Sequence, residues 1–255
     1  MNLLAIETTG ANASVAIINE SKKIWEEYCD ETMNHLRFLI PMIETLLEKC
    51  GLKMQDIDGI AVSEGPGSFT GIRIGIATAK ALAQALNLEI VCVPTLRAFA
   101  YGAVEEKRIL CPIFDARRSQ VYAGAYIWEA QDVCTQLIDD AAYMLEDFLT
   151  QMQAVLEKTG QTEILFFGDG ISPYKEQIEE WAQRLKHENA QGTQPVIDFA
   201  PEERRFQKAS SVAALGYKLW EQGNAQNLFQ AKPVYLRQAE AQRKLEEAKR
   251  RLVHE

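Results

Sequence analysis

The stretch Leu4-Ala5-Ile6-Glu7-Thr8-Thr9 places a carboxylate and two hydroxyls directly after a short apolar run. A matching junction, Phe114-Asp115-Ala116, follows a second apolar run near residues 109–114. Short apolar runs bounded by polar turns are typical of buried β-strands. Two such strands that each end on an acid indicate that the chain contains two halves of similar construction.

Around these two junctions, the spacing of apolar residues predicts the same order of elements twice. In the first half we expect three strands, a helix, a strand, a helix, a strand and a short helix, near residues 2–7, 13–19, 22–29, 33–50, 57–63, 71–86, 89–93 and after Pro94. In the second half we expect the same series near residues 109–114, 120–127, 133–138, 142–158, 163–167, 173–188, 195–199 and 208–222. A βββαβαβα order that occurs twice, with an acid after each first strand, is the plan of the actin/hexokinase/Hsp70-like (ASKHA) ATPase fold. That fold is an α/β fold of two lobes with a nucleotide between them.

This order divides the 255 residues into two lobes and an extension. The N-terminal lobe is expected to span residues 1–105. The C-terminal lobe is expected to span residues 106–225, and its last helix is left free to pack back on the first lobe. Residues 226–255 are expected to form a C-terminal extension and a tail helix. Composition agrees with a folded globular chain, since 47% of the residues are hydrophobic and 25% are charged.

The net charge argues against a protein that grips nucleic acid by itself. The chain has 27 Lys and Arg against 36 Asp and Glu, which gives a formal net charge of −9. Binding to DNA or RNA draws most of its affinity from basic groups that neutralise phosphates, so we expect no binding to DNA. Residues 232–255 are the exception, because they hold seven Lys or Arg against four Glu. This basic tail either touches RNA phosphates or forms a solvated helix.

The expected location follows from three sequence features. Uncharged apolar runs such as 38–43 are far shorter than the roughly 18 residues that a membrane-spanning helix needs. The N-terminus has no basic segment of the kind that opens a signal peptide. The five cysteines stand far apart along the chain, which is typical of reduced thiols rather than of a disulfide framework or a zinc site. We therefore expect a cytoplasmic protein without a membrane segment.

The least ordinary stretch is the Gly-rich loop Ser63-Glu64-Gly65-Pro66-Gly67-Ser68-Phe69-Thr70-Gly71. Its glycines allow a ligand to approach the backbone, Ser68 offers a hydroxyl, and the expected helix points its positive end into the loop. However, the stretch matches neither a dinucleotide fingerprint nor a Walker A loop. Two interpretations are therefore open: nucleotide binding through Gly65, Gly67 and Ser68, or tight packing of the loop against another part of the protein.

Glu7 with Thr8 and Thr9 is a second candidate nucleotide site. A carboxylate at a strand end beside two hydroxyls can hold a hydrated Mg²⁺ and a phosphate. The alternative is a polar turn that caps two strands, and we favour it because the turn contains only one glycine, Gly10.

The second half supplies the remaining candidates for a nucleotide site between the lobes. Asp115, followed by Arg117 and Arg118, is either a phosphate clamp or an ordinary surface ion-pair cluster. The counterpart of the Gly-rich loop in this half is formed by Gly168, Asp169 and Gly170.

The histidines predict that the chain holds no metal. Only His35, His187 and His254 occur, and no two of them have the spacing of a paired-His metal site. Metalloprotease chemistry is therefore not expected. The sequence also lacks the Gly-x-Ser-x-Gly turn that positions the nucleophile of many serine hydrolases.

Two helices of the first half carry more apolar surface than one sheet face needs. The helix near 33–50 is apolar on two sides, and the helix near 71–86 carries a row of small residues that lets another helix approach closely. Burial of both helices inside the first lobe is one interpretation. We favour contact with a second subunit. The residues assigned to this interface are Leu36, Leu39, Ile40, Ile43, Leu46, Ile72, Gly75, Ile76 and Ala79.

Several stretches of this sequence occur together in one protein family. They are Leu4-Ala5-Ile6-Glu7-Thr8-Thr9, Asn34-His35-Leu36, Leu39-Ile40-Pro41-Met42-Ile43, the segment 64–75, Asp115-Ala116-Arg117-Arg118 and Pro233-Val234-Tyr235-Leu236-Arg237. On these stretches the chain resembles, over nearly its whole length, the bacterial TsaB (YeaZ) family, which is related to the TsaD/Kae1 branch of ASKHA proteins. The Gly-Pro-Gly-Ser-Phe-Thr-Gly-Ile-Arg stretch within 64–75 is the most specific of them.

The resemblance implies a role in tRNA modification. In that family, threonylcarbamoyl is transferred from threonylcarbamoyl-AMP to N6 of the adenosine next to the anticodon of ANN-decoding tRNAs. The transferase is TsaD, whose paired-His metal site this chain does not match. The resemblance therefore implies a non-catalytic subunit that binds TsaD as a heterodimer through helices of the N-terminal lobe and activates it. The P-loop ATPase TsaE is a further implied partner, and tRNA is contacted only indirectly. Whether the chain also forms a homodimer is open.

The alternative is a stand-alone ATP-dependent small-molecule kinase or ATPase of the same fold, with Glu7 and Asp115 at the metal and phosphates. For the subunit function no cofactor is expected to be required. It is left open whether ATP or ADP with Mg²⁺ binds at a lobe or subunit interface.

Overall fold

The first lobe contains the first series of predicted elements. The structure is a computed structural model that describes residues 1–29, 35–130, 132–188 and 194–236. The elements of the first lobe are β1 (Asn2–Glu7), β2 (Ala13–Asn19), β3 (Ile24–Cys29), α1 (His35–Cys50), η1 (Met54–Asp56), β4 (Gly59–Gly65), α2 (Phe69–Leu86), β5 (Glu89–Pro94) and α3 (Thr95–Tyr101).

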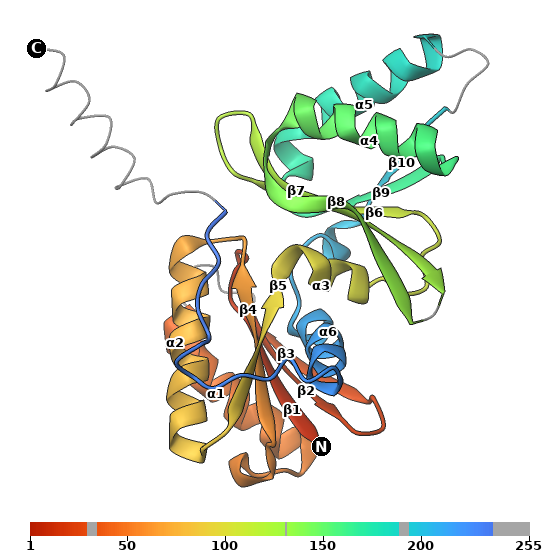
Figure 1. Cartoon of the computed structure of the whole chain (residues 1–255). Coiled ribbons are helices and arrows are strands. Elements are labelled where there is room, and N and C mark those ends of the chain that lie inside the picture. The colour runs from red at the N-terminus through yellow and green to blue at the C-terminus, as the bar shows by residue number, and fades with distance from the viewer. Residues whose placement is uncertain (30–34, 131, 189–193, 237–255) are drawn as a thin grey trace, which may run out of the picture.

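The second half of the chain repeats this series of elements, although its last helix packs on the sheet of the first lobe. Its elements are β6 (Ile109–Asp115), β7 (Gln120–Ala130), β8 (Val133–Met144), α4 (Leu145–Thr159), β9 (Glu163–Phe167), α5 (Ile171–Glu188), β10 (Val196–Phe199), η2 (Glu202–Arg204) and α6 (Ala209–Glu221). Figure 1 shows the two lobes one above the other.

The strand order confirms the ASKHA fold. The first sheet has the order β3-β2-β1-β4-β5, and the second, β8-β7-β6-β9-β10, repeats it strand for strand. In each sheet the first strand of the half pairs antiparallel with the second strand and parallel with the fourth. Each first strand therefore lies at the centre of its sheet, and Glu7 and Asp115 occupy equivalent positions at the strand ends.

Several element boundaries predicted from the sequence were wrong by a few residues, and three of them have a clear structural cause. Helix α2 begins at Phe69 rather than at residue 71, because Ser68 caps it: the Ser68 hydroxyl accepts a hydrogen bond from Gly71 N–H at 3.3 Å. Strand β8 continues to Met144 instead of ending near residue 138, since its last residues stay paired with the start of β7. Helix α4 consequently begins at Leu145 rather than near residue 142.

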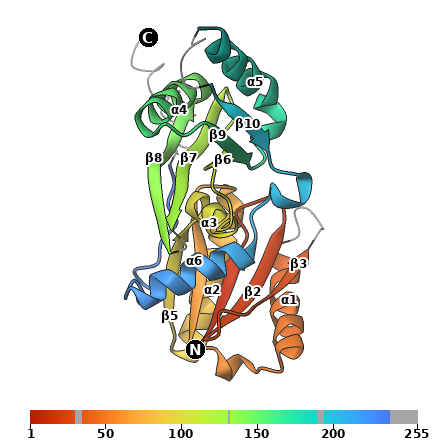
Figure 2. The same ribbon diagram turned by 90° about the vertical axis from the view of Figure 1, so that its right-hand side faces the viewer.

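Helices cover both faces of the first sheet (Figure 2). Alternate residues of a strand point to opposite faces. Leu4 and Ile6 of β1 lie in the core beneath α1 and α2, whereas Leu3 and Ala5 pack with α6. Helix α6 follows the second lobe in sequence, yet it lies on the sheet of the first lobe.

Helix α3 joins the two lobes through an apolar cluster. The Phe99 ring lies 5.5 Å from the Phe114 ring and 5.8 Å from the Phe167 ring, measured between centroids, and both partners belong to the second lobe. In addition, the Trp128 indole N–H donates to the Ala100 carbonyl at 2.9 Å. These buried contacts fix the lobes against each other.

After α6 the chain returns across the first lobe as an extended segment, residues 224–236, which we call the strap. Its Gln226 forms two backbone hydrogen bonds with Ile90 on the edge strand β5, at 2.8 and 2.9 Å. Further along, Ala231 is fully buried, and Val234 N–H donates to the Glu64 carbonyl at 2.7 Å. The strap runs beside α2 to the Gly-rich loop (Figure 1). The predicted tail helix lies outside the described residues.

Within the described ranges, no helix is long and apolar enough to cross a membrane. The five cysteines are free thiols.

Candidate functional site at the Gly-rich loop

Glu7 lies at the carboxyl end of β1 with its side chain completely buried. Its Oε1 accepts hydrogen bonds from Thr9 N–H at 2.5 Å and from the Thr9 hydroxyl at 2.6 Å. Its Oε2 accepts a hydrogen bond from the Ser63 hydroxyl. Burial raises the pKa of Glu7, and these hydrogen bonds oppose that shift only in part. The carboxylate therefore ties the turn between β1 and β2 to the end of β4.

Thr8 and Thr9 pack directly against the Gly-rich loop. The Thr8 hydroxyl donates to the Gly71 carbonyl at 2.8 Å, and Ser68 N–H donates to the Thr9 carbonyl at 2.7 Å. A Cβ at Gly71 would overlap the Thr8 carbonyl, and a Cβ at Gly67 would lie 2.7 Å from the Thr9 Cβ. Only glycine allows this close approach.

The Gly-rich loop is thus held in place by the turn between β1 and β2. Of the two interpretations that the sequence leaves open, tight packing of the Gly-rich loop is what these contacts demonstrate. The polar turn favoured for Glu7 is likewise present. Binding of a nucleotide by Glu7, Thr8, Thr9, Gly65, Gly67 and Ser68 stays a prediction.

The second lobe brings its own candidate residues together. Asp169 Oδ1 accepts a hydrogen bond from Asp115 N–H at 3.0 Å, and Asp115 Oδ1 accepts one from the Tyr174 hydroxyl at 3.0 Å. Gly168 has a φ of +98°, and a Cβ there would overlap the Ile113 carbonyl. Gly170 N–H donates to the same carbonyl at 3.1 Å. The ends of β6 and β9, which both carry candidate residues for the nucleotide site, therefore lie next to each other.

The electrostatics of this second cluster come from burial. Burial raises the pKa of Asp169, and it raises the pKa of Tyr174 to about 12. Arg117 lies 3.5 Å from Asp115 Oδ2, but its side chain is 85% exposed. This is the surface ion pair that the sequence offered as an alternative. A phosphate clamp formed by Asp115, Arg117 and Arg118 stays a prediction.

The residues assigned to a partner interface need correction. Most of them lie in the core of the first lobe, between the sheet and the helices α1 and α2. Gly75 is buried there, and six side chains are at most 4% exposed: Leu39, Ile43, Leu46, Ile72, Ile76 and Ala79. Packing on the sheet takes up this apolar face first, so these residues cannot reach a partner. Ile40, at 44% exposure, is on the surface. The side chain of Leu36 lies outside the described residues.

The outward face of α2 was missed in that assignment. It exposes Arg73, Ala77 and Ala81, and Ile74 beside them is half-buried. At the start of the same helix, Phe69 packs against Tyr235 of the strap. The helical period separates this face from the buried one, so the exposure of Ala77 and Ala81 could have been predicted from the sequence. It contained no signal for the contact between Phe69 and Tyr235.

In the ranges that the structure describes, no three His, Cys, Asp or Glu side chains stand close enough together to hold a metal ion.

Comparison with known proteins places these features in a family. A family model described as "TsaD: tRNA N6-adenosine threonylcarbamoyltransferase" matches residues 30–245. A Bacillus subtilis protein named "tRNA threonylcarbamoyladenosine biosynthesis protein TsaB" is 33% identical over 244 residues, which cover 96% of this chain and 97% of that relative. The protein of the same name from Escherichia coli is 36% identical over 142 residues, or 52% of this chain and 60% of that relative.

A solved structure agrees with this relationship. The structure titled "YeaZ from Pseudomonas aeruginosa" matches with a TM-score of 0.72 and 26% sequence identity, and the match covers 92% of this chain and 99% of that one. Sequence and fold thus point to the same relatives over nearly the whole chain. The chain therefore belongs to the TsaB (YeaZ) family, within the wider group that the TsaD family model matches.

Proposed function

We propose that this protein acts in the biosynthesis of threonylcarbamoyladenosine in tRNA as a non-catalytic subunit that binds and activates a TsaD-type transferase. The names of its relatives support the pathway, because full-length similarity to TsaB extends over both lobes and the strap. TsaE and tRNA are further members of the proposed assembly. The net charge of −9 favours tRNA contacts made mainly by the partners.

The observation that carries the proposal is the outward face of the two helices of the first lobe. Helix α2 exposes Ala77 and Ala81 in a row, and α1 exposes Ile40. Small side chains allow a partner helix to approach closely, and apolar ones gain free energy when they leave water. The same face is suited to pairing with a second copy of this chain when the transferase is absent.

The proposal is tested by mixing the purified protein with the TsaD-type transferase of the same organism. Size-exclusion chromatography and calorimetry should detect a heterodimer. Transfer of threonylcarbamoyl from threonylcarbamoyl-AMP to tRNA should depend on this chain. If transfer proceeds equally well without it, the proposed function is wrong.

Two variants test the surface. Ala77→Glu and Ile40→Glu place a charge on exposed positions, so the protein should fold while affinity for the transferase drops at least tenfold, by about 1.4 kcal/mol or more. Ala154→Glu, an exposed alanine of α4 in the second lobe, is the matched control and should bind normally. Unchanged binding by both variants would rule out this face as the interface.

The alternative, an independent ATPase or kinase, has its own test. Turnover of ATP by the isolated chain that Glu7→Gln abolishes would establish that activity and contradict a non-catalytic subunit. We expect no turnover, because Thr9 and Ser63 already engage both carboxylate oxygens of Glu7.

A further inference from the structure

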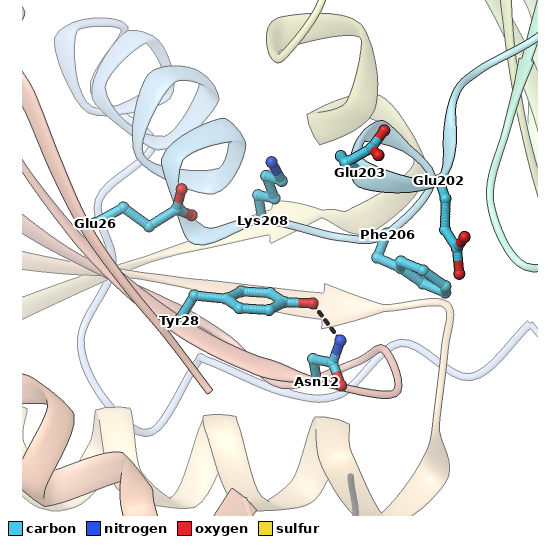
Figure 3. A pocket seen from close by; sticks show the side chains of 7 residues that line it. All are labelled: Asn12, Glu26, Tyr28, Glu202, Glu203, Phe206 and Lys208. Atoms are coloured by element: carbon cyan, nitrogen blue, oxygen red, sulfur yellow. Dashed lines mark hydrogen bonds between the residues drawn. The ribbon is translucent and has the colours of Figure 1, made fainter. Parts of the chain in front are cut away.

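A pocket of about 530 Å³ lies between the edge of the first sheet and the segment that leads from the second lobe into α6. Its volume falls within the range of small-molecule sites, about 300–1,000 Å³. Figure 3 shows its lining, which consists of Asn12, Glu26, Tyr28, Glu202, Glu203, Phe206 and Lys208. We call it the β3–linker pocket. It shares no residue with the outward face of α2 or with the Gly-rich loop.

The lining of the pocket is acidic. It contains three carboxylates and a single ammonium group, that of Lys208. The arginines that follow Glu202 and Glu203 in the chain are engaged elsewhere: Arg204 Nη1 lies 3.4 Å from Glu106 Oε1, and Arg205 Nε donates to the Ala200 carbonyl at 2.7 Å. Neither arginine therefore forms an ion pair with the carboxylates of η2.

Hydrogen bonds hold two side chains of the wall, Glu26 and Asn12, in place. Glu26 is held in place because its Oε1 accepts a hydrogen bond from Ser210 N–H at 2.8 Å, at the start of α6. Asn12 donates through its amide nitrogen to the Tyr28 hydroxyl. Its carbonyl oxygen is buried and has no hydrogen-bond partner among the described residues. This oxygen has almost no accessible surface, so the pocket offers a ligand the Glu26 carboxylate rather than the Asn12 carbonyl.

Aromatic rings complete the lining. Tyr28 of β3 and Phe206 of the segment before α6 both line the pocket, as Figure 3 shows. The face of an aromatic ring attracts a cation, and a planar guanidinium both stacks on such a face and donates several N–H groups at once. Carboxylates and aromatic faces thus favour the same type of ligand.

We propose that the β3–linker pocket binds a small organic cation with a guanidinium or primary ammonium group. The cationic end lies near Glu202 and Glu203, away from Lys208, and the body of the molecule lies against Tyr28 and Phe206. The chemistry is shared by free guanidines and polyamines and by an arginine side chain that a peptide presents. This site is independent of the proposed role in tRNA modification.

The test is calorimetric titration of the full chain with agmatine, with spermidine and with a blocked Gly-Arg-Gly peptide. N-butylurea serves as an uncharged probe. Saturable binding of the cations and none of N-butylurea is expected. Tighter binding of agmatine or spermidine identifies a free metabolite as the ligand type, and tighter binding of the peptide identifies a presented arginine. If no cationic probe binds saturably, the proposal is wrong.

Variants connect binding to the pocket. Glu203→Gln should weaken binding about tenfold, since it removes one charge-assisted partner, and Phe206→Leu should weaken it by loss of the ring. Lys208→Met should tighten binding because it removes a like charge. Glu157→Gln, on the exposed side of α4, is the control for general attraction to an acidic protein. Equal effects of Glu203→Gln and Glu157→Gln would overturn the proposal. So would weaker binding by Lys208→Met, which would mark an anion site.

Discussion

The ring of Tyr235 stacks on the ring of Phe69, with the centroids 4.5 Å apart and the planes inclined by 29°. Arg73 strengthens the pair: its guanidinium carbon lies 3.9 Å from the centre of the Phe69 ring, and its Nε donates to the Tyr235 hydroxyl at 3.0 Å. Two of the stretches typical of the family, the Gly-rich loop and the end of the strap, thereby form one surface at the start of α2.

Tyr235→Ala removes the stack and the hydrogen bond from Arg73. We expect a loss of about 1 kcal/mol in the free energy of unfolding, since an aromatic pair contributes about that much beyond area burial. Urea denaturation measures the change. Phe229→Ala, at a strap residue that is 79% exposed, is the control and should leave stability nearly unchanged. Equal effects of the two variants would show that the stack does not anchor the strap.

Gly71→Ala forces a Cβ into the space occupied by the Thr8 carbonyl. Alanine favours a helix by about 1 kcal/mol over glycine, but the overlap with fixed backbone should outweigh this and cost about 2 kcal/mol or more in total. Thermal unfolding checks the prediction. Gly160→Ala, where φ is +69° and no atom lies within 4 Å of the added Cβ, should cost only about 1 kcal/mol. A smaller effect at Gly71 than at Gly160 would contradict the packing of the loop.

Ala79→Glu and Ala77→Glu place the same charge on the two faces of α2. Ala79 is fully buried, so its substitution leaves an unpaired charge in the core and should cost about 3–5 kcal/mol, enough to unfold much of the protein. Ala77 is exposed and should tolerate Glu within about 0.5 kcal/mol. Circular dichroism and urea denaturation distinguish them. A folded Ala79→Glu variant would show that α2 is not seated as described.

Asp140→Asn should change the dependence of stability on pH. Burial raises the pKa of Asp140 from 3.8 to about 6, although the side chain accepts a hydrogen bond from the Tyr126 hydroxyl. The folded protein therefore holds this proton more tightly than the unfolded chain does. As pH rises from about 4 to about 6, the proton is lost and the free energy of unfolding of the wild type falls, by at most about 3 kcal/mol.

The Asn variant lacks this titration, so its stability relative to the wild type should rise over the same pH window and stay constant above it. Urea denaturation at a series of pH values measures the difference. Asp139→Asn, at the exposed neighbour, removes only a minor contribution to this raised pKa and should shift the pH profile slightly, without abolishing the titration. A parallel profile for Asp140→Asn would exclude Asp140 as the source.

The element order could be predicted because strands and helices leave different periods in the sequence. The duplication of the sheet was visible from the two strand-end acids, Glu7 and Asp115, and the strand order confirmed it. The predicted start of α2 and the predicted end of β8 were wrong. The Ser68 hydroxyl caps α2 so that it begins at Phe69, and continued pairing with β7 extends β8 to Met144. Neither leaves a periodic signal.

The partner residues show a different limit. Leu39, Ile43 and Ala79 were predicted to bind a partner because they are apolar. In the structure this apolar helix face packs on the sheet beneath it. A surface that binds a partner is what remains after this packing, and in α2 that is Ala77 and Ala81. Hydrophobicity alone does not distinguish the two faces.

The sequence by itself determined the two-lobed fold, the family and the acidic net charge, because composition, period and motif are local properties of the chain. The tertiary structure alone decided that Glu7 is enclosed by Thr9 and Ser63, that the strap meets Phe69, and that a pocket forms beside β3. Each of these depends on segments far apart in the chain, and their approach is set by the packing of the sheets and helices between them.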